Sequence, residues 1–144
     1  MTVAAILKQK GREVASIVPA TTILEAATMM HARRIGALLV MDSAGQVLGI
    51  LSERDIVASL AEHAARTLEM TAAQLMTSEL QTATPRTTVE EAMRMMTDGR
   101  FRHVPVLEDG KLVGLVSIGD VVKARISTQE QEVDSLRAYV AGAA

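Results

Sequence analysis

The sequence predicts an α/β fold in which two β-α-β-β-α repeats pack with pseudo-twofold symmetry. Three observations lead to this prediction. The chain resembles itself at an offset of 65–66 residues. Within each copy, short strand-like apolar runs alternate with apolar residues at helical spacing. Each copy also carries two matched signals for the start of a helix.

The internal repeat is visible in two blocks of matching residues. Val18–Met30 corresponds to Thr84–Met96, and Gly49–Asp55 corresponds to Gly114–Asp120. The offset falls from 66 to 65 between these blocks. A one-residue difference therefore lies in the turn that separates the blocks, which contains glycine in both copies.

The elements follow in the same order in both copies. A strand before Pro19 ends there, because proline cannot donate to a sheet ladder. Thr22 with Glu25, and Thr88 in the second copy, then form capping boxes that start a helix. The remaining elements of copy one are a helix with the apolar face Ile23, Ala26, Ala27 and Met30, strands over Ala37–Met41 and Val47–Leu51, and a helix from Ser52. Their counterparts are Val89, Ala92, Met93 and Met96, strands over His103–Leu107 and Lys111–Val116, and a helix from Ser117.

The repeat divides the chain into residues 1–66, residues 67–126 and a helical tail over residues 127–144. Copy one starts with a strand over Val14–Val18, preceded by Thr2–Leu7, which matches Thr71–Met76 and predicts a short linker helix. In the tail, Val133, Leu136 and Val140 form a narrow apolar stripe at i, i+3 and i+7. Such a stripe indicates packing on a neighbouring element or a second subunit.

Composition excludes several classes of function. The net charge is −2, so a basic surface for nucleic acid or membranes is not expected. The chain has no cysteine and only three histidines, which argues against disulfides, thiolate catalysis and metal centres. No nucleophile–base pair or phosphate-binding loop is visible, so we expect a protein that is not an enzyme and requires no cofactor. The absence of a targeting or membrane-spanning pattern leads us to expect a cytoplasmic protein.

A glycine-led apolar strand followed by Ser-x-x-Asp occurs twice, as Gly49–Asp55 and Gly114–Asp120. With the preceding Pro-x-Thr-Thr segments and Arg102–Val106 (R-H-V-P-V), this arrangement resembles the CBS (cystathionine β-synthase) domain pair, or Bateman module, over about Val3 to Ile126. The resemblance implies two CBS repeats that bind AMP, ADP, ATP, S-adenosylmethionine or NAD in clefts between them. It also implies a homodimer that regulates another, unidentified protein.

The two Ser-x-x-Asp motifs have a chemistry of their own. Ser52 and Ser117 stand at helix starts, where free backbone N–H groups and the helix dipole attract phosphate. Asp55 and Asp120 lie in the first turn and can accept hydrogen bonds from both hydroxyls of a ribose. The same pattern is also an ordinary helix N-cap with an acidic third residue. Either aspartate is therefore a candidate ribose ligand, and the capping interpretation stays open beside it.

Cationic side chains distinguish the two copies. Arg54 lies inside the first motif, while Arg102 and His103 replace Gly36 and Ala37 of copy one. They resemble family residues that approach a nucleotide phosphate. For Arg102 the alternative is a solvated arginine, and for His103 a half-buried side chain bonded to a carbonyl.

Adenine is expected to contact the first strand of each copy, through its apolar side chains and its backbone polar groups. The candidates are Ile17 and Val18 in copy one and Thr82 and Thr84 in copy two. The sequence therefore favours a stand-alone module that senses adenosine nucleotides. The alternative is a structural dimerisation or interaction module that binds no ligand.

Overall fold

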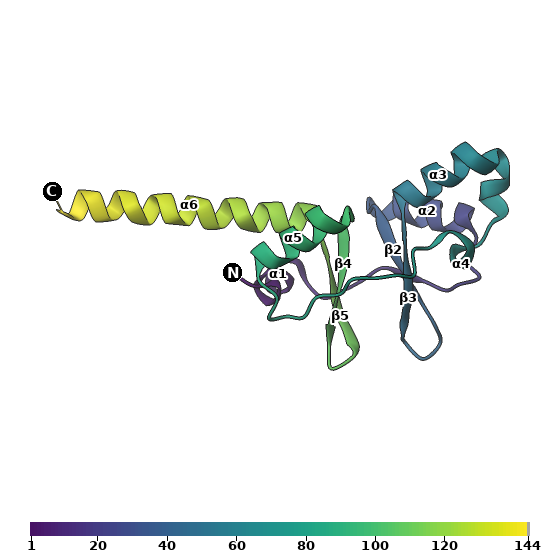
Figure 1. The fold of residues 1–144 in the computed structure, drawn as a ribbon, viewed down its shortest axis with the longest axis horizontal. Coiled ribbons are helices and arrows are strands. Elements are labelled where there is room, and N and C mark those ends of the chain that lie inside the picture. The colour runs from purple at the N-terminus through teal and green to yellow at the C-terminus, as the bar shows by residue number, and fades with distance from the viewer. Residues whose placement is uncertain (144) are drawn as a thin grey trace. The chain divides into compact units, whose positions relative to one another are not determined.

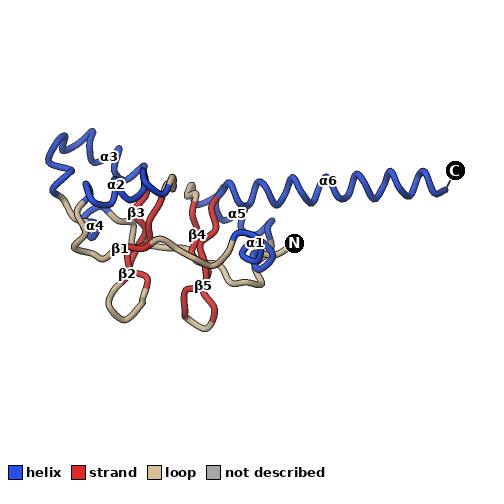
Figure 2. The backbone as a smooth tube through the Cα atoms, turned by 180° about the vertical axis from the view of Figure 1, so that it is seen from behind, coloured by secondary structure: helices blue, strands red, loops and turns tan. Residues whose placement is uncertain are grey.

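The computed structural model describes residues 1–143 and confirms the α/β class and the repeated order of elements. The chain forms two compact units: unit 1 comprises Met1–Arg12 and Gln81–Ala144, and unit 2 comprises Glu13–Leu80. Ala144 lies outside the described residues. Figure 1 labels the α-helices and most of the strands along the chain, and β1 is labelled in Figure 2.

Unit 2 is one continuous stretch of chain built around a three-stranded sheet in the order β1-β2-β3. Strand β1 runs parallel to β2, and β2 runs antiparallel to β3, with Ala37 opposite Ser52 at one end. The elements of unit 2 are β1 (Ser16–Ile17), α2 (Ile23–Arg33), β2 (Ala37–Met41), β3 (Val47–Ser52), α3 (Glu53–His63), a 3₁₀ helix (Ala64–Glu69) and α4 (Ala72–Leu75).

Unit 1 repeats this plan around a two-stranded antiparallel sheet. His103 pairs with Ser117, as Ala37 pairs with Ser52 in unit 2. In each unit the turn of the hairpin lies at the opposite end of the two strands from the helix that directly follows the hairpin (Figure 2). The elements of unit 1 are α1 (Val3–Lys10), α5 (Val89–Gly99), β4 (His103–Glu108), β5 (Lys111–Ser117) and α6 (Ile118–Ala143).

Each unit contains its own cluster of buried apolar side chains. In unit 2, Ile23, Ala26 and Met30 of α2 pack with residues of β2 and β3, such as Leu38 and Leu51. This apolar face is the one that the helical spacing predicts. Thr22 caps α2, because its side chain accepts a hydrogen bond from the Glu25 backbone N–H, which is one half of the predicted capping box.

The helices that lead the two repeats are exchanged between the units. Helix α1 precedes copy one in sequence, yet Val3, Ile6 and Leu7 belong to the buried cluster of unit 1. Helix α4 precedes copy two, and its Ala72 belongs to the buried cluster of unit 2. The compact units therefore divide the chain differently from the sequence repeats at residues 66 and 67. The predicted linker helices exist, and each completes the unit of the other repeat.

Two predicted elements differ from the structure. The first strand is only Ser16–Ile17 instead of Val14–Val18, and it ends before Val18 because the Val18 N–H bonds the Thr21 hydroxyl and leaves the ladder. In copy two this strand is reduced to one bridge, between Ala83 and Val106. The tail is helical through Ala143, as predicted, but it is not a separate helix. It continues the last helix of copy two without a break as α6, which extends beyond α1 and α5 (Figure 1).

Candidate functional site

The first Ser-x-x-Asp motif forms a complete capping box at the start of α3. The Asp55 N–H donates to Ser52 Oγ at 3.3 Å. In return, Asp55 Oδ2 accepts hydrogen bonds from the Ser52 N–H at 2.8 Å and the Ser52 hydroxyl at 3.0 Å. The capping interpretation therefore describes this motif correctly as it stands without a ligand.

The second motif makes the same cap at the start of α6 and adds an ion pair. Asp120 Oδ2 accepts from the Ser117 N–H at 2.8 Å, and the Asp120 N–H donates to Ser117 Oγ at 3.2 Å. Lys10 Nζ, at the end of α1, lies 2.6 Å from the same Oδ2 and also donates to the Leu115 carbonyl at 2.8 Å. Lys10 thus joins the leading helix to the second motif.

The pKa of Asp120 is lowered from its ordinary value of 3.8. Burial on its own would raise the pKa of this carboxyl, since the charged form loses water. The hydrogen bonds from Lys10 and the Ser117 backbone, together with the Lys10 charge, outweigh burial and lower the pKa. Asp120 is therefore a carboxylate at neutral pH, and its side chain is still 23 % exposed.

Both aspartates retain acceptor capacity. The hydrogen bonds from the Ser52 N–H and hydroxyl to Asp55, and those from the Ser117 N–H and Lys10 to Asp120, end on Oδ2. Each Oδ1 is therefore the oxygen on which a further donor can bond, since a carboxylate has about four lone-pair sites. Neither motif has to lose its cap before it accepts a hydroxyl group.

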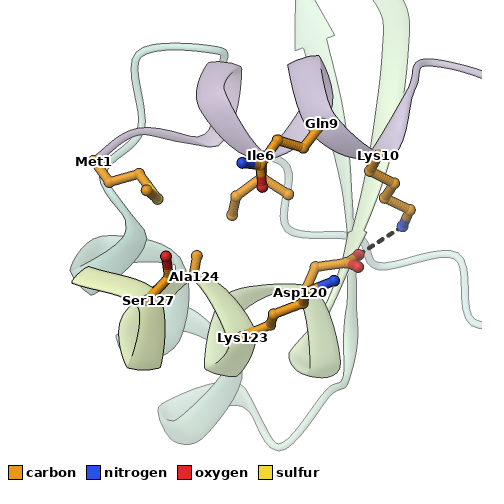
Figure 3. A pocket seen from close by; sticks show the side chains of 8 residues that line it. All are labelled: Met1, Ile6, Gln9, Lys10, Asp120, Lys123, Ala124 and Ser127. Carbon is orange, nitrogen blue, oxygen red and sulfur yellow. Dashed lines mark hydrogen bonds and ion pairs between the residues drawn. The ribbon is translucent and has the colours of Figure 1, made fainter. Parts of the chain in front are cut away.

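A pocket of about 420 Å³ borders the second motif within unit 1. Figure 3 shows Lys10 and Asp120 at one side of it, with Lys123 one turn further along α6. Its walls come from α1 and α6, with Met1 beside them. The lining residues are Met1, Ile6, Gln9, Lys10, Asp120, Lys123, Ala124 and Ser127. Two ammonium groups and one carboxylate are thus brought to one small hollow.

The structure brings Arg102 and His103 to the second motif. The Arg102 carbonyl accepts the Ile118 N–H at 2.8 Å, which fixes Arg102 at the start of α6, and its side chain is exposed. His103 is half-buried and pairs across the sheet with Ser117. In unit 2 the equivalent hydrogen bond runs from the Glu53 N–H to the Gly36 carbonyl, so glycine stands where unit 1 has Arg102. The predicted difference in cations between the copies therefore has a structural counterpart.

The first-strand candidates lie further from the motifs. Ile17 pairs with Val40, three residues along β2 from the end where Ser52 lies, about 10 Å away along the strand. The Ile17 side chain is only 7 % exposed and belongs to the core. The backbone N–H and C=O of Val18 are both bonded to Thr21. The structure thus places Ile17 and Val18 away from the Ser52 end of the sheet.

Thr82 and Thr84 flank the buried Ala83 and are both exposed. The Thr84 backbone is bonded to Thr87, as Val18 is bonded to Thr21. At the repeat offset of 66 residues, Thr82 corresponds to Ser16, and the buried Ala83 corresponds to Ile17. Ser16 is exposed and is a candidate that the sequence reasoning missed.

Lys10 and Lys123 were also missed. Lys10 is separated from Asp120 by 110 residues, so local patterns give no sign of their contact. The alignment of Thr2–Leu7 with Thr71–Met76 does offer one signal. It places Lys10 opposite Glu79, a reversal of charge at one position of the repeat.

Arg54 is exposed in the first turn of α3. Its guanidinium stands in the same turn as Asp55, so the first motif has one cation of its own. Within residues 1–143, no helix is both long enough and apolar enough to cross a membrane.

Comparison with known proteins gives one family. The CBS domain family matches residues 10–62 and 72–127. The mitochondrial CBS domain-containing protein CBSX3 of Arabidopsis thaliana is 34 % identical over 149 aligned positions, which cover 98 % of this chain and 72 % of that protein.

Solved structures agree with this match. The CBS-domain containing protein ATU1752 from Agrobacterium tumefaciens has a TM-score of 0.85 and 46 % identity, and the match covers 87 % of this chain and 99 % of that one. CBSX2, solved in complex with AMP, has a TM-score of 0.73 and 26 % identity, and the match covers 89 % of this chain and 98 % of that one. Sequence, fold and the doubled motif together show that this chain belongs to the CBS domain family, with two CBS domains.

Proposed function

We propose that this protein is a regulatory module that binds an adenosine nucleotide (AMP, ADP or ATP) at the Ser117–Asp120 motif of unit 1. The kinship with CBSX2, which was solved with AMP, supports the ligand class. NAD and S-adenosylmethionine share the adenosine group and are the next ligands to try. The module performs no chemistry on the nucleotide and transmits its presence to another protein. We place it in the cytoplasm, as a homodimer.

The observation that carries the proposal is the set of cations around Asp120. Lys10 contacts the carboxylate, and Lys123 lines the same pocket. Arg102 is fixed at the start of α6, where the helix dipole also favours an anion. His103 faces Ser117 across the hairpin. Phosphate groups are the ligands that such a set of donors binds best.

Asp120 and Lys10 have complementary roles in this proposal. Asp120 Oδ1 accepts the ribose hydroxyls, while Oδ2 keeps its bond to the Ser117 N–H. The Lys10 ammonium group has three protons and donates two of them, to the Leu115 carbonyl and to Asp120. Its third proton, together with Lys123 and Arg102, is available to phosphate oxygens.

The test is isothermal titration of AMP, ADP and ATP into the wild type and the Asp120→Ala variant. Loss of hydrogen bonds to a charged group weakens binding by about 1.5–3 kcal/mol, roughly a 10- to 150-fold rise in Kd. Asp55→Ala is the matched control, since it removes the same capping acid from the other unit. Binding to 2′-deoxy-AMP should show the same loss with the wild type and no further loss with Asp120→Ala.

Stability of the free protein is measured beside affinity. Removal of an acid from the first turn of a helix costs about 0.3–1 kcal/mol in the absence of ligand. An Asp120→Ala variant that binds every adenosine nucleotide as tightly as the wild type would contradict the proposal.

One observation favours a second function. Both Ser–Asp pairs are satisfied as caps without any ligand, as expected for a structural dimerisation module. The titration separates the two functions, because a structural module shows no saturable heat with any of the nucleotides.

A further inference from the structure

The second half of α6 has no partner within its own unit. Every residue from Gln129 to Gly142 is exposed, whereas Val121 and Ala124 near the start of the helix are buried. Isolated helices of fewer than about 12–15 residues are marginal in water, and most helices in proteins are stabilised by packing of an apolar face. This exposed segment of α6 is therefore too short to be stable by itself and needs another element to pack against.

An apolar stripe on α6 follows a heptad pattern. Ile126, Val133 and Val140 follow one another at intervals of seven residues, which places them at the a position of a heptad. Leu136, three residues after Val133, is then at the d position. These four side chains are 50 %, 47 %, 60 % and 63 % exposed, in the order Ile126, Val133, Val140 and Leu136. The a and d positions of the pattern are Val122, Ile126, Gln129, Val133, Leu136 and Val140.

The residue types select a two-stranded parallel arrangement. All three a positions from Ile126 onward are β-branched, and Leu136 is at d. β-Branched residues at a with leucine at d favour parallel dimers, in which each side chain faces its counterpart. Gln129 is the one polar residue at a d position within this run, and it weakens the apolar seam at that layer.

The flanking charges are complementary between two copies of the same helix. Glu132 occupies a g position and Arg137 the next e position, five residues on. In a parallel coiled coil, a g residue of one helix meets the next e residue of the other. Two copies in register therefore form two symmetric Glu132–Arg137 pairs. Both side chains are exposed within one chain, and neither has an ion pair among the described residues.

We propose that α6 pairs with α6 of a second copy as a parallel, in-register coiled coil from Ile126 to Val140. The inference rests on the homodimer named under the proposed function and is independent of nucleotide binding. Since the run is shorter than three heptads, it needs the folded units to hold it in register, and the full chain is the material for every test.

A single-cysteine experiment tests both pairing and direction. The chain has no cysteine, so Val140→Cys introduces the only thiol. In the parallel arrangement the two thiols meet at an a position, within the Cα separation of roughly 4.4–6.8 Å that a disulfide bridges. Mild oxidation should convert most of the protein to a disulfide-linked dimer. Gln131→Cys, at the outer f position of the same segment, is the matched control and should stay unlinked.

An antiparallel pair would bring Val140 to the other end of the second helix, so Val140→Cys would not cross-link. Failure of Val140→Cys to cross-link in a protein that sediments as a dimer would overturn the proposal and leave the homodimer in place. A wild type that sediments as a single 15.4 kDa chain would overturn both the coiled coil and the homodimer.

Charge and apolar variants give the energetic readout. Leu136→Lys buries two ammonium groups in the seam and should raise the dimer Kd about 100-fold or more. Glu132→Arg should raise it by about 3- to 10-fold, and the double variant Glu132→Arg/Arg137→Glu should restore it. AMP titration into Leu136→Lys separates the two proposals, because nucleotide binding is expected to survive the loss of the dimer. No recovery in the double variant would contradict the parallel register.

Discussion

The two Ser-x-x-Asp motifs make the same helix cap and differ in what surrounds it. Around Asp55, the motif supplies Glu53 and Arg54, and Gly36 stands at the helix start. Around Asp120, Lys10 arrives from α1 and Arg102 stands where unit 2 has Gly36. The same local pattern thus gives two equivalent caps, one with Arg54 as its neighbouring cation and one with Lys10 and Arg102 beside it. The cap is common to both repeats. The candidate ligand chemistry comes from Lys10 and Arg102, which have no cationic counterpart in the first repeat.

The largest expected contrast concerns two equivalent glycines, Gly49 and Gly114. A Cβ at Gly49 would lie 2.8 Å from the Thr77 carbonyl, a backbone atom fixed by its pairing with Ile50. A Cβ at Gly114 would lie 2.6 Å from Leu7 Cδ2, the end of a flexible side chain. Gly49→Ala should therefore cost about 3 kcal/mol of unfolding free energy and Gly114→Ala about 1 kcal/mol.

Urea unfolding of the two glycine variants measures both costs. Equal costs would show that Leu7 is held as rigidly as the backbone at Thr77. The contrast therefore tests how tightly α1 packs on the hairpin at Gly114 and how tightly the segment after α4 packs on the hairpin at Gly49.

The next contrast is between two arginines. Arg102→Ala should weaken AMP binding by about 1.5–3 kcal/mol, because a charged donor to phosphate is lost. Arg54→Ala is the matched variant in the first motif and should leave the Kd unchanged. Titration with adenosine, which has no phosphate, should not distinguish Arg102→Ala from the wild type. A larger loss for Arg54→Ala would move the candidate site to unit 2.

A third contrast uses the capping serines. Ser52→Ala and Ser117→Ala should each cost about 1 kcal/mol of unfolding free energy, the usual loss for an N-cap side chain. The loss should be the smaller for Ser117→Ala, since Lys10 still holds the Asp120 carboxylate in place. Thermal unfolding midpoints of the two variants give the comparison, and a larger loss for Ser117→Ala would contradict it.

The smallest effect is the dependence of stability on acid. The pKa of Asp120 is lowered in the folded state, so its contribution is complete above its unfolded pKa of 3.8. The contribution is lost as the pH falls through the lowered folded value. Both partners are partly exposed, which limits the ion pair to about 0.2–1 kcal/mol.

Lys10→Met removes the ion pair and keeps the bulk of the side chain. Between pH 7 and pH 4 this variant should be less stable than the wild type by that amount, and the share of the difference that the ion pair contributes should be lost as the pH falls through the lowered pKa of Asp120. A difference that did not change with pH would assign the effect of Lys10 to packing or to its hydrogen bond with the Leu115 carbonyl.

The sequence was a good guide where contacts are local. The hairpin of Ala37–Met41 and Val47–Ser52, the caps at Thr22 and Ser52, and the helix start at Ser117 depend on residues that are close in the sequence, and the structure confirms them. The first strand was predicted too long, because a hydroxyl of Thr21 takes the Val18 N–H. The Lys10–Asp120 contact could not be predicted, since it depends on which unit α1 joins.

The exchange of the leading helices has a consequence for biosynthesis. Unit 2 is continuous, but Val3, Ile6 and Leu7 of α1 find their buried partners only in residues from Ala83 to Ala124. At a synthesis rate of about 5–20 residues per second, α1 waits on the order of ten seconds for the end of that stretch. During that interval its apolar face is open to chaperones and to other nascent chains. The helix made first is thus among the last to reach its native neighbours.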